Sequence, residues 1–336
     1  MDVSRPAPRV AVVGARRLRE GTGPFLARQC VAAGARLVAV VGTSTASARA
    51  AAEDCAAFAG AAPHACTSVA EAAGHGLDAV VIASPAGTHG AHVEAALAHG
   101  LHVLCEKPLL AADSDPPAML RAHGDRVAQL AARFAAAGLT LSENCQWPHT
   151  LAAFRALHPD FDPGAATRFR MELAPGSAHA GMRRWSETAS HPMSLLQAAA
   201  GDACNDADGI LAVDFVTAPS SGAAICRFQY RSGGAPQRPP VAAELHLLAT
   251  DTRPRPAAFA FDGRPCRRRV AMPGYRIHFE SDAGPAVAAE DPMEAGVRAF
   301  LTRVVRKEGG ADRGLVARQR MLGDLLLAAA GSGAGA

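Results

Sequence analysis

The chain has 336 residues, more than a single hydrophobic core usually holds, so we expect two domains. Hydrophobic residues make up 49% and charged residues 19%, which excludes a largely disordered chain, and the net charge of +3 gives no reason to expect nucleic acid or a membrane surface as a partner. The sequence contains no run of about 20 apolar residues and no apolar signal core near its start, so we expect a cytoplasmic protein without a membrane span.

Short apolar strands and helices alternate along the first part of the chain. The pattern predicts strands at 9–13, 37–41, 78–83, 102–105 and 139–143, and helices at 24–33, 46–59, 69–73, 89–99 and 121–137. This alternation predicts an α/β domain with a doubly wound parallel sheet. Ligands bind such sheets at the carboxyl ends of the strands, so we expect one crevice to be bordered by Gly14, Gly42, Ser84, Pro85, Glu106 and Lys107.

From about Trp147 the pattern changes to strands separated by turn-rich pieces. Strands are predicted at 167–173, 210–217, 223–230, 241–249, 257–261 and 275–280, and helices at 190–200, 293–305 and 315–329. An α+β domain with a large, mostly antiparallel sheet is the simplest arrangement. We therefore divide the chain into domains at 1–145 and 146–330.

The turn after the first strand is longer than the usual Gly-x-Gly-x-x-Gly loop of dinucleotide-binding folds. It runs from Gly14 to Pro24, and Gly21, Thr22 and Gly23 precede the helix. Glycines allow the backbone to approach a pyrophosphate at a helix N-terminus, so we expect Gly14 and residues 21–23 to bind a dinucleotide. An ordinary glycine-rich turn is the alternative.

The residues after the second strand bear on the choice of cofactor. An NAD enzyme usually places Asp or Glu there to bind the ribose diol, whereas this chain has Thr43 and Ser44. Hydroxyls together with Arg16 or Arg17 from the preceding loop suit a 2′-phosphate, so we expect NADP(H) to be preferred over NAD(H). The alternative is that the arginines are solvated loop residues.

Only two of the 34 basic residues are lysines, Lys107 and Lys307. An ammonium can release a proton when burial depresses its pKa, but a guanidinium cannot, so a lysine in an arginine-rich chain is a candidate for proton transfer. Lys307 fits an exposed helix end. The eight cysteines are widely spaced and include no Cys-x-x-Cys pair, so we expect buried thiols, no disulfide framework and no metal site.

Two motifs carry a resemblance to a known family. The strand 80–83 leads into a turn with Pro85 and His89, and Glu106-Lys107-Pro108-Leu109 follows a helix and a further strand. This order resembles the glucose–fructose oxidoreductase/inositol dehydrogenase (Gfo/Idh/MocA) family. The resemblance implies an N-terminal Rossmann domain followed by an α+β domain with a large open sheet. It also implies that Lys107 lies near the nicotinamide, that Glu106 and Pro108 shape its turn, and that the Lys107–Pro108 bond is cis. For His89, capping or packing beside the cofactor is favoured over proton transfer.

The family also has an Asp-x-x-x-His motif, whose best match here is Glu187 and His191. Glu187 stands where Asp is usual, and Ser194 where another Asp often falls. A His beside a carboxylate suits acid–base catalysis, and the alternative for His191 is a residue at the helix start that only packs or hydrogen bonds. Five further residues are expected to line a substrate pocket: Gln146, Trp147, His149, Arg184 and Trp185. Core packing is the alternative for Trp147, and a solvated turn is the alternative for the arginine pair at 183–184.

The expected reaction is hydride transfer between the nicotinamide and a sugar, cyclitol or related hydroxyl, keto or imine substrate, with Lys107 and His191 handling the proton. Two alternatives stay open: a catalytically reduced NADP(H)-binding sensor or scaffold, and an NAD-dependent glycoside-cleaving enzyme. The resemblance also implies a homodimer or homotetramer.

Overall fold

The computed structural model describes residues 6–16, 21–111, 114–175, 180–217, 223–250, 252–282 and 284–334. The chain forms two compact units, each built from segments that are distant in sequence. The first consists of Met1–Leu110, Arg126–Asn144 and Met293–Asp312, and the second of Ala111–Asp125, Cys145–Pro292 and Arg313–Ala336. The domain division at residue 145 stays a prediction, since these units are not continuous in sequence.

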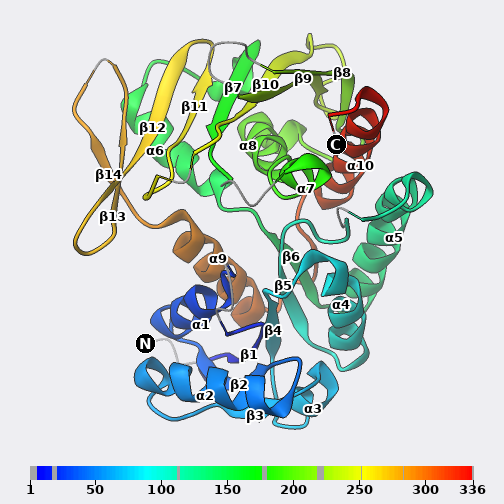
Figure 1. Cartoon of the computed structure of the whole chain (residues 1–336), viewed down its shortest axis with the longest axis vertical. Helices are drawn as coiled ribbons and strands as arrows, with labels where there is room; N and C mark the ends of the chain where they lie inside the picture. Colours follow the sequence, from blue (N-terminus) through cyan, green and yellow to red (C-terminus); the bar gives the residue numbers. More distant parts are fainter. Residues whose placement is uncertain are drawn as a thin grey trace. The chain divides into compact units, whose positions relative to one another are not determined.

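The first unit contains a seven-stranded sheet in which every pairing is parallel (Figure 1). Its order is β15 (Gly310–Ala311), β6 (Thr140–Asn144), β5 (His102–Glu106), β4 (Ala79–Ile82), β1 (Arg9–Val13), β2 (Arg36–Val41) and β3 (His64–Cys66). The predicted doubly wound parallel sheet is confirmed. The strands β3 and β15 were not predicted, because segments of two or three residues carry no periodic signal.

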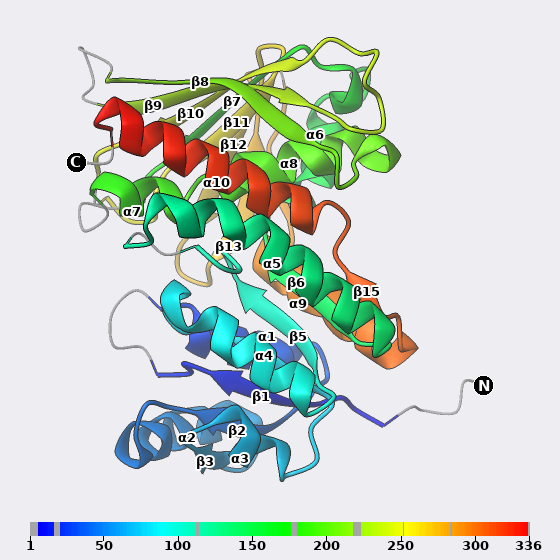
Figure 2. The same cartoon turned by 90° about the vertical axis from the view of Figure 1, so that its right-hand side faces the viewer.

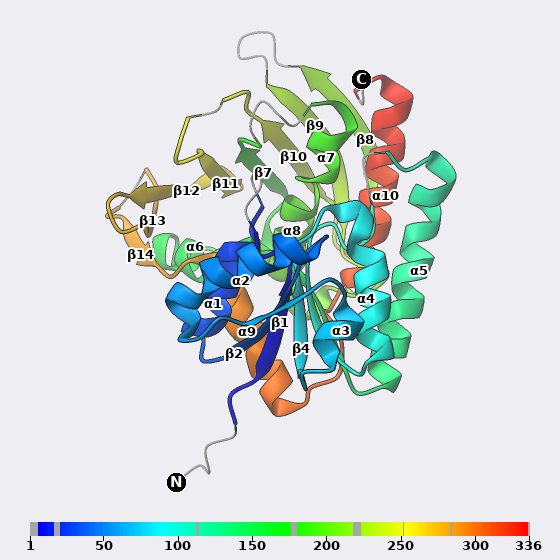
Figure 3. The ribbon, with the colours of Figure 1, turned by 60° about the horizontal axis from the view of Figure 1, so that its bottom comes forward.

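Helices pack on both faces of this sheet, because its apolar strands must be covered on both sides. One face is covered by α1 (Gly23–Ala32), α2 (Thr45–Ala59) and α9 (Pro292–Arg306), whose side chains share a core with β1 (Figure 3). The other helical segments of this unit are α3 (Val69–Ala73), η1 (Ala86–Thr88), α4 (His89–Ala98) and the later part of α5 (Pro117–Ala136). Thus α9 completes the N-terminal core although it comes from the far end of the chain.

The second unit contains an eight-stranded mixed sheet. Its order is β14 (Val287–Ala289), β13 (Arg276–Glu280), β12 (Arg264–Ala271), β11 (Ala257–Phe261), β7 (Arg168–Leu173), β10 (Val241–Leu247), β9 (Ala224–Arg231) and β8 (Gly209–Thr217). Only the β7–β10 pairing is parallel, so the predicted mostly antiparallel sheet is confirmed. The strand β12 was not predicted, because its run of arginines hides the alternation of a half-buried strand.

Helices lie along one face of the second sheet, as Figure 2 shows for α8 and α10. The helical segments are η2 (Trp147–Thr150), α6 (Leu151–Leu157), η3 (Pro163–Ala165), α7 (Gly181–Ser186), α8 (Ser190–Ala200), η4 (Gly201–Ala203) and α10 (Leu315–Ser332). Alternate residues of β11 point into the core, where Phe259 and Phe261 pack against Phe154 of α6. Burying each such ring contributes about 1.5–3 kcal/mol.

All eight cysteines are buried and free. Within the described part of the chain, no helix combines the length and the hydropathy that crossing a bilayer requires.

Candidate active site

The strand order of the first sheet reverses beside β1, which lies between β2 and β4. Open α/β sheets bind ligands at the carboxyl ends of the strands at such a point. Gly14 follows β1 directly and has φ +79°, a left-handed conformation that favours glycine. A Cβ on this residue would lie 2.8 Å from the Ala83 carbonyl oxygen, after β4. The turn therefore brings the ends of β1 and β4 into close contact.

The start of α1 meets the same turn. A Cβ on Gly23 would lie only 2.0 Å from the Gly14 carbonyl oxygen, so the helix backbone approaches the strand end as closely as glycine allows. Glycines have this packing role in dinucleotide-binding folds. Gly21, by contrast, has open space around its Cα. Although the loop is irregular in sequence, its two ends therefore lie in close backbone contact, and the binding of a pyrophosphate there stays a prediction.

A carboxylate connects the loop to the end of β5. The hydroxyl of Thr22 donates to Glu106 Oε1 at 2.8 Å, and Nδ2 of Asn144 donates to the same oxygen at 2.8 Å. Glu106 thus joins three segments and precedes Lys107 directly. Asn144 was not among the predicted site residues, because only the tertiary structure brings the end of β6 beside Glu106.

The turn that carries Lys107 is anchored on its other side as well. The Lys107–Pro108 peptide is cis, as predicted, and Lys107 is half-buried. The backbone N–H of Leu109 donates to Glu143 Oε1 at 3.0 Å, and the N–H of Glu143 donates to Asp312 Oδ2 at 2.9 Å. Burial, with the nearby carboxylates of Glu143 and Glu106, raises the pKa of the Cys105 thiol well above its usual value. Cys105 is therefore a neutral part of the core beneath the turn.

His89 links two of the strand-end turns. Its Nδ1 lies 2.8 Å from the Pro108 carbonyl oxygen and its Nε2 2.8 Å from the Ser84 carbonyl oxygen, and the side chain is 1% exposed. The ring therefore holds the turn after β4 to the turn that carries Lys107. Pro85, in the first of these turns, is exposed.

The described residues that we predicted to bind a 2′-phosphate lie at the surface. Thr43 and Ser44 follow β2 and are exposed, and Ser44 Oγ caps α2 by accepting from the Ser47 N–H at 3.2 Å. Arg16 is exposed, two residues after Gly14. Arg17 lies outside the described residues.

In the second unit, His191 lies in the first turn of α8 and is 9% exposed. The indole of Trp147 meets its ring edge to face, with the ring centroids 6.3 Å apart. Glu187 ends α7 and accepts from Nε of Arg183 at 2.9 Å. The structure thus places Trp147 beside His191 and pairs Glu187 with an arginine.

The other residues predicted to bind substrate differ in exposure. Gln146 and Arg184 are half-buried, and His149 is exposed. Trp147 and Trp185 are each 2% exposed and belong to the hydrophobic core of this unit. Contact of these residues with a substrate stays a prediction.

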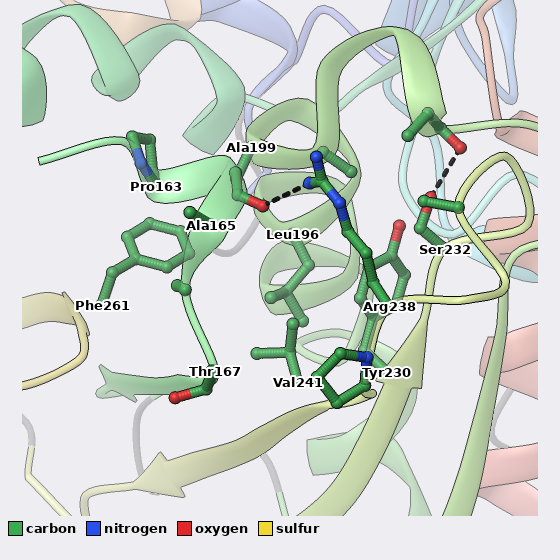
Figure 4. A pocket seen from close by; sticks show the side chains of 16 residues that line it. Pro163, Ala165, Thr167, Leu196, Ala199, Tyr230, Ser232, Arg238, Val241 and Phe261 are labelled. Carbon is green, nitrogen blue, oxygen red and sulfur yellow. Dashed lines mark hydrogen bonds between the residues drawn. The ribbon is translucent and has the colours of Figure 1, made fainter.

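A separate cavity of about 340 Å³ lies between η3, α8 and β10 (Figure 4). Its walls are mainly apolar, and Arg238 crosses its mouth to donate to the Gly164 carbonyl oxygen at 3.0 Å. None of the predicted site residues that the structure describes lines this cavity.

The parallel sheet and the turns at its strand ends identify the first unit as a Rossmann-type dinucleotide-binding unit. Residues 8–136 match the family described as "Oxidoreductase family, NAD-binding Rossmann fold". The resemblance seen in the sequence is thereby confirmed for residues 8–136, which match the NAD-binding Rossmann fold of the Gfo/Idh/MocA oxidoreductases.

Solved structures share the fold over nearly the whole chain. One is a UDP-N-acetylglucosamine 3-dehydrogenase from Acidithiobacillus ferrooxidans, 21% identical, with a TM-score of 0.63 over 95% of this chain and 96% of that one. Another is a 3-ketoreductase from Actinomadura kijaniata in complex with NADP and TDP-benzene, 18% identical, with a TM-score of 0.65 over 95% and 96%. A third is an oxidoreductase from Pseudomonas syringae, 17% identical, with a TM-score of 0.66 over 98% of each chain. No curated protein sequence matches the chain significantly.

Proposed function

We propose that the protein is an NADP(H)-dependent oxidoreductase that interconverts a hydroxyl and a keto group on a sugar, a cyclitol or a related compound. The observation that carries this proposal is the anchoring of the Lys107 turn. Glu106, His89 and, through Leu109, Glu143 all fix this turn at the end of β5. Three independent anchors on one turn favour a role that needs an accurately placed side chain.

The dinucleotide would be held by the backbone around Gly14 and Gly23 at the start of α1, where the strand end and the helix meet too closely for a Cβ at either glycine. The nicotinamide would accept or supply the hydride. Lys107 would hydrogen bond to the reacting oxygen and exchange its proton. An ammonium can both donate a hydrogen bond and release a proton, whereas a guanidinium keeps its proton, which suits a lysine to this task.

His191 would be the second proton-handling group, taking the hydroxyl proton during oxidation and returning it during reduction. Imidazole is suited to both directions, because its usual pKa lies near neutrality. One carboxylate oxygen of Glu187 accepts a hydrogen bond from Arg183, so this carboxylate is shared with an arginine. We therefore assign Glu187 a weaker role than Lys107 and His191.

We propose NADP(H) as the preferred cofactor, held through its 2′-phosphate by Thr43, Ser44 and Arg16 or Arg17. Charge-assisted bonds to a phosphate contribute about 1.5–3 kcal/mol each, so NADPH should bind at least tenfold more tightly than NADH. Arg16→Ala should remove most of that preference. Titration of both cofactors by fluorescence tests this expectation.

Arg28 offers a matched control for Arg16. Its guanidinium lies 5.1 Å from the centroid of the Phe58 ring, between α1 and α2. Arg28→Ala removes the same charge and should leave the ratio of the two dissociation constants unchanged. Tighter binding of NADH than NADPH by the unaltered protein would show that the assignment of the cofactor is wrong.

The substrate proposal draws on two structural relatives, a UDP-N-acetylglucosamine 3-dehydrogenase and a 3-ketoreductase solved with TDP-benzene. We propose a sugar nucleotide as the first substrate class to test, with free sugars and cyclitols as further members. The assay incubates the protein with NADP⁺ and UDP-N-acetylglucosamine, a TDP-sugar or myo-inositol, and follows the absorbance of the reduced nicotinamide. Net reduction of NADP⁺ with any of these supports the proposal.

Two other results would favour the alternatives. Tightly bound NADP(H) that no substrate oxidises or reduces would favour a sensor. Glycoside cleavage without net formation of reduced cofactor would favour the glycoside-cleaving enzyme.

We also propose a cytoplasmic homodimer or homotetramer, and the eight free cysteines are consistent with a reducing compartment.

A further inference from the structure

An arginine occupies an inward position on β12. The inward-facing positions of this strand include Cys266, which is fully buried, and Arg268 two residues later. Arg268 pairs with Ala257 of β11 on one side and Phe279 of β13 on the other, and both of these residues are buried. The Arg268 side chain therefore lies on the apolar face of the sheet.

The two neighbouring arginines of the strand, unlike Arg268, each form an ion pair. Arg267 pairs with Asp282 at 2.7 Å and Arg269 with Glu280 at 2.5 Å. Arg268 has no carboxylate within ion-pair distance among the described residues; Asp291 acts on it only through longer-range attraction. Burial lowers its pKa, and it remains a cation without an adjacent countercharge.

The groups that do contact Arg268 satisfy only part of its hydrogen-bonding capacity. One terminal nitrogen donates to the Arg255 carbonyl oxygen at 3.0 Å, and the guanidinium carbon lies 5.8 Å from the centroid of the Trp147 ring. The Nε atom is buried and has no hydrogen-bond partner in the described part of the chain. A buried donor on a cation is costly to leave unsatisfied, so such a group is usually explained by a partner that binds it.

The same indole ring that packs against Arg268 also packs against His191. The Arg268 guanidinium carbon and the His191 ring centroid lie 5.8 and 6.3 Å from the centroid of the Trp147 ring. Trp147 therefore connects an uncompensated cation to the histidine proposed to handle the proton. A molecule that reacts beside His191 would therefore have the Arg268 guanidinium only one side chain away.

We propose that Arg268 is a specificity-determining residue that binds an anionic oxygen group of the substrate, a phosphate or a carboxylate. The planar guanidinium can donate two parallel hydrogen bonds to either group, and it packs beside the Trp147 ring. This proposal rests on the proposed function only for the position of the substrate at His191. It narrows the substrate class to anionic sugars, which include sugar nucleotides and sugar acids.

Calorimetric binding to the full-length protein tests the proposal without requiring turnover. The probes are UDP, which carries phosphates, glucuronate, which carries a carboxylate, and N-acetylglucosamine, which is neutral. Arg268→Met should weaken binding of at least one anionic probe by about 10- to 100-fold and leave the neutral probe unaffected. Loss of UDP binding assigns a phosphate, and loss of glucuronate binding assigns a carboxylate.

The matched control is Arg269→Met, which removes the same charge from the next position of the strand but on the opposite face. It should bind all three probes as the unaltered protein does. Equal losses in both variants would show a general charge effect and overturn the proposal. Unchanged affinity in Arg268→Met, or failure of the unaltered protein to bind either anionic probe, would also overturn it.

Thermal unfolding separates binding from a structural role. If Arg268 serves a ligand, Arg268→Met should unfold at the same or a higher temperature than the unaltered protein, because an apolar side chain replaces a half-buried cation that has no ion pair among the described residues. A lower unfolding temperature with unchanged anion affinity would show a structural role. Should the methionine variant fail to fold, Arg268→Lys replaces it in the test. This variant keeps the charge but lacks the planar guanidinium, so it should bind the anionic probe several-fold more weakly than the unaltered protein does.

The result can be separated from that of the proposed function. Anion binding that depends on Arg268 in a protein that turns over no substrate would support this inference and count against the proposed oxidoreductase activity. Turnover of neutral sugars at rates unaffected by Arg268→Met would support the proposed oxidoreductase activity and count against this inference.

Discussion

Replacing Lys107 by alanine should lower kcat by about 10²- to 10⁴-fold, the contribution usual for a general acid–base group, while NADPH affinity stays within a few-fold of normal. The loss should fall on kcat and kcat/KM together, because the proposed interaction forms only as charge develops on the reacting oxygen. Arg at position 107 should not restore activity, since a guanidinium keeps its proton. Steady-state kinetics with saturating cofactor measures both variants.

Lys307 provides a matched control for Lys107, because it is the other lysine of the chain. It is exposed at the end of α9, and Lys307→Ala should leave kcat unchanged. Circular dichroism of the Lys107 variants establishes that the fold is intact. If Lys107→Ala turned over substrate at a near-normal rate, Lys107 would not be the proton-handling group.

Replacing Gly23 by alanine should destabilise the protein by about 3 kcal/mol and abolish dinucleotide binding. The added methyl carbon would lie 2.0 Å from the Gly14 carbonyl oxygen and 2.7 Å from its carbonyl carbon. Both are backbone atoms, so no change of rotamer relieves the contact, and α1 must move away from the end of β1. Denaturant unfolding and cofactor titration report the two effects separately.

Gly21 is the matched control for this change, two residues earlier in the same loop. A Cβ there would meet nothing within 4 Å, so Gly21→Ala should change the free energy of unfolding by less than about 0.5 kcal/mol. A Gly23→Ala protein as stable as the Gly21→Ala protein would mean that the close approach of α1 to β1 is not required.

The sequence was most informative where the signal is local. The strands of the parallel sheet are short apolar runs that end in glycine, proline or a charged motif, so their positions and the crevice at their carboxyl ends could be predicted. The cis bond before Pro108 could be inferred from the motif that contains it. These features depend on residues close together in the chain.

The remaining features depend on contacts between distant segments. Glu106 binds Thr22 and Asn144, and nothing in the local sequence around Asn144 indicates that partnership. α9 completes the core of the first unit from near the end of the chain, which periodicity alone does not reveal. Arg268 lies within a run of three arginines that resembles a solvated segment, and only strand pairing shows that it faces inward while Arg267 and Arg269 face outward.

The contact between Gly14 and Gly23 has a consequence for the evolution of this protein. It fixes both ends of the segment between them, so the strand–helix junction does not depend on how many residues that segment contains. Closing a longer loop costs little, about 0.6 kcal/mol for each doubling of its length. Insertions and substitutions can therefore accumulate between the two glycines while the strand–helix junction stays intact. The coenzyme preference of related proteins can then change through this loop, without changes in the sheet.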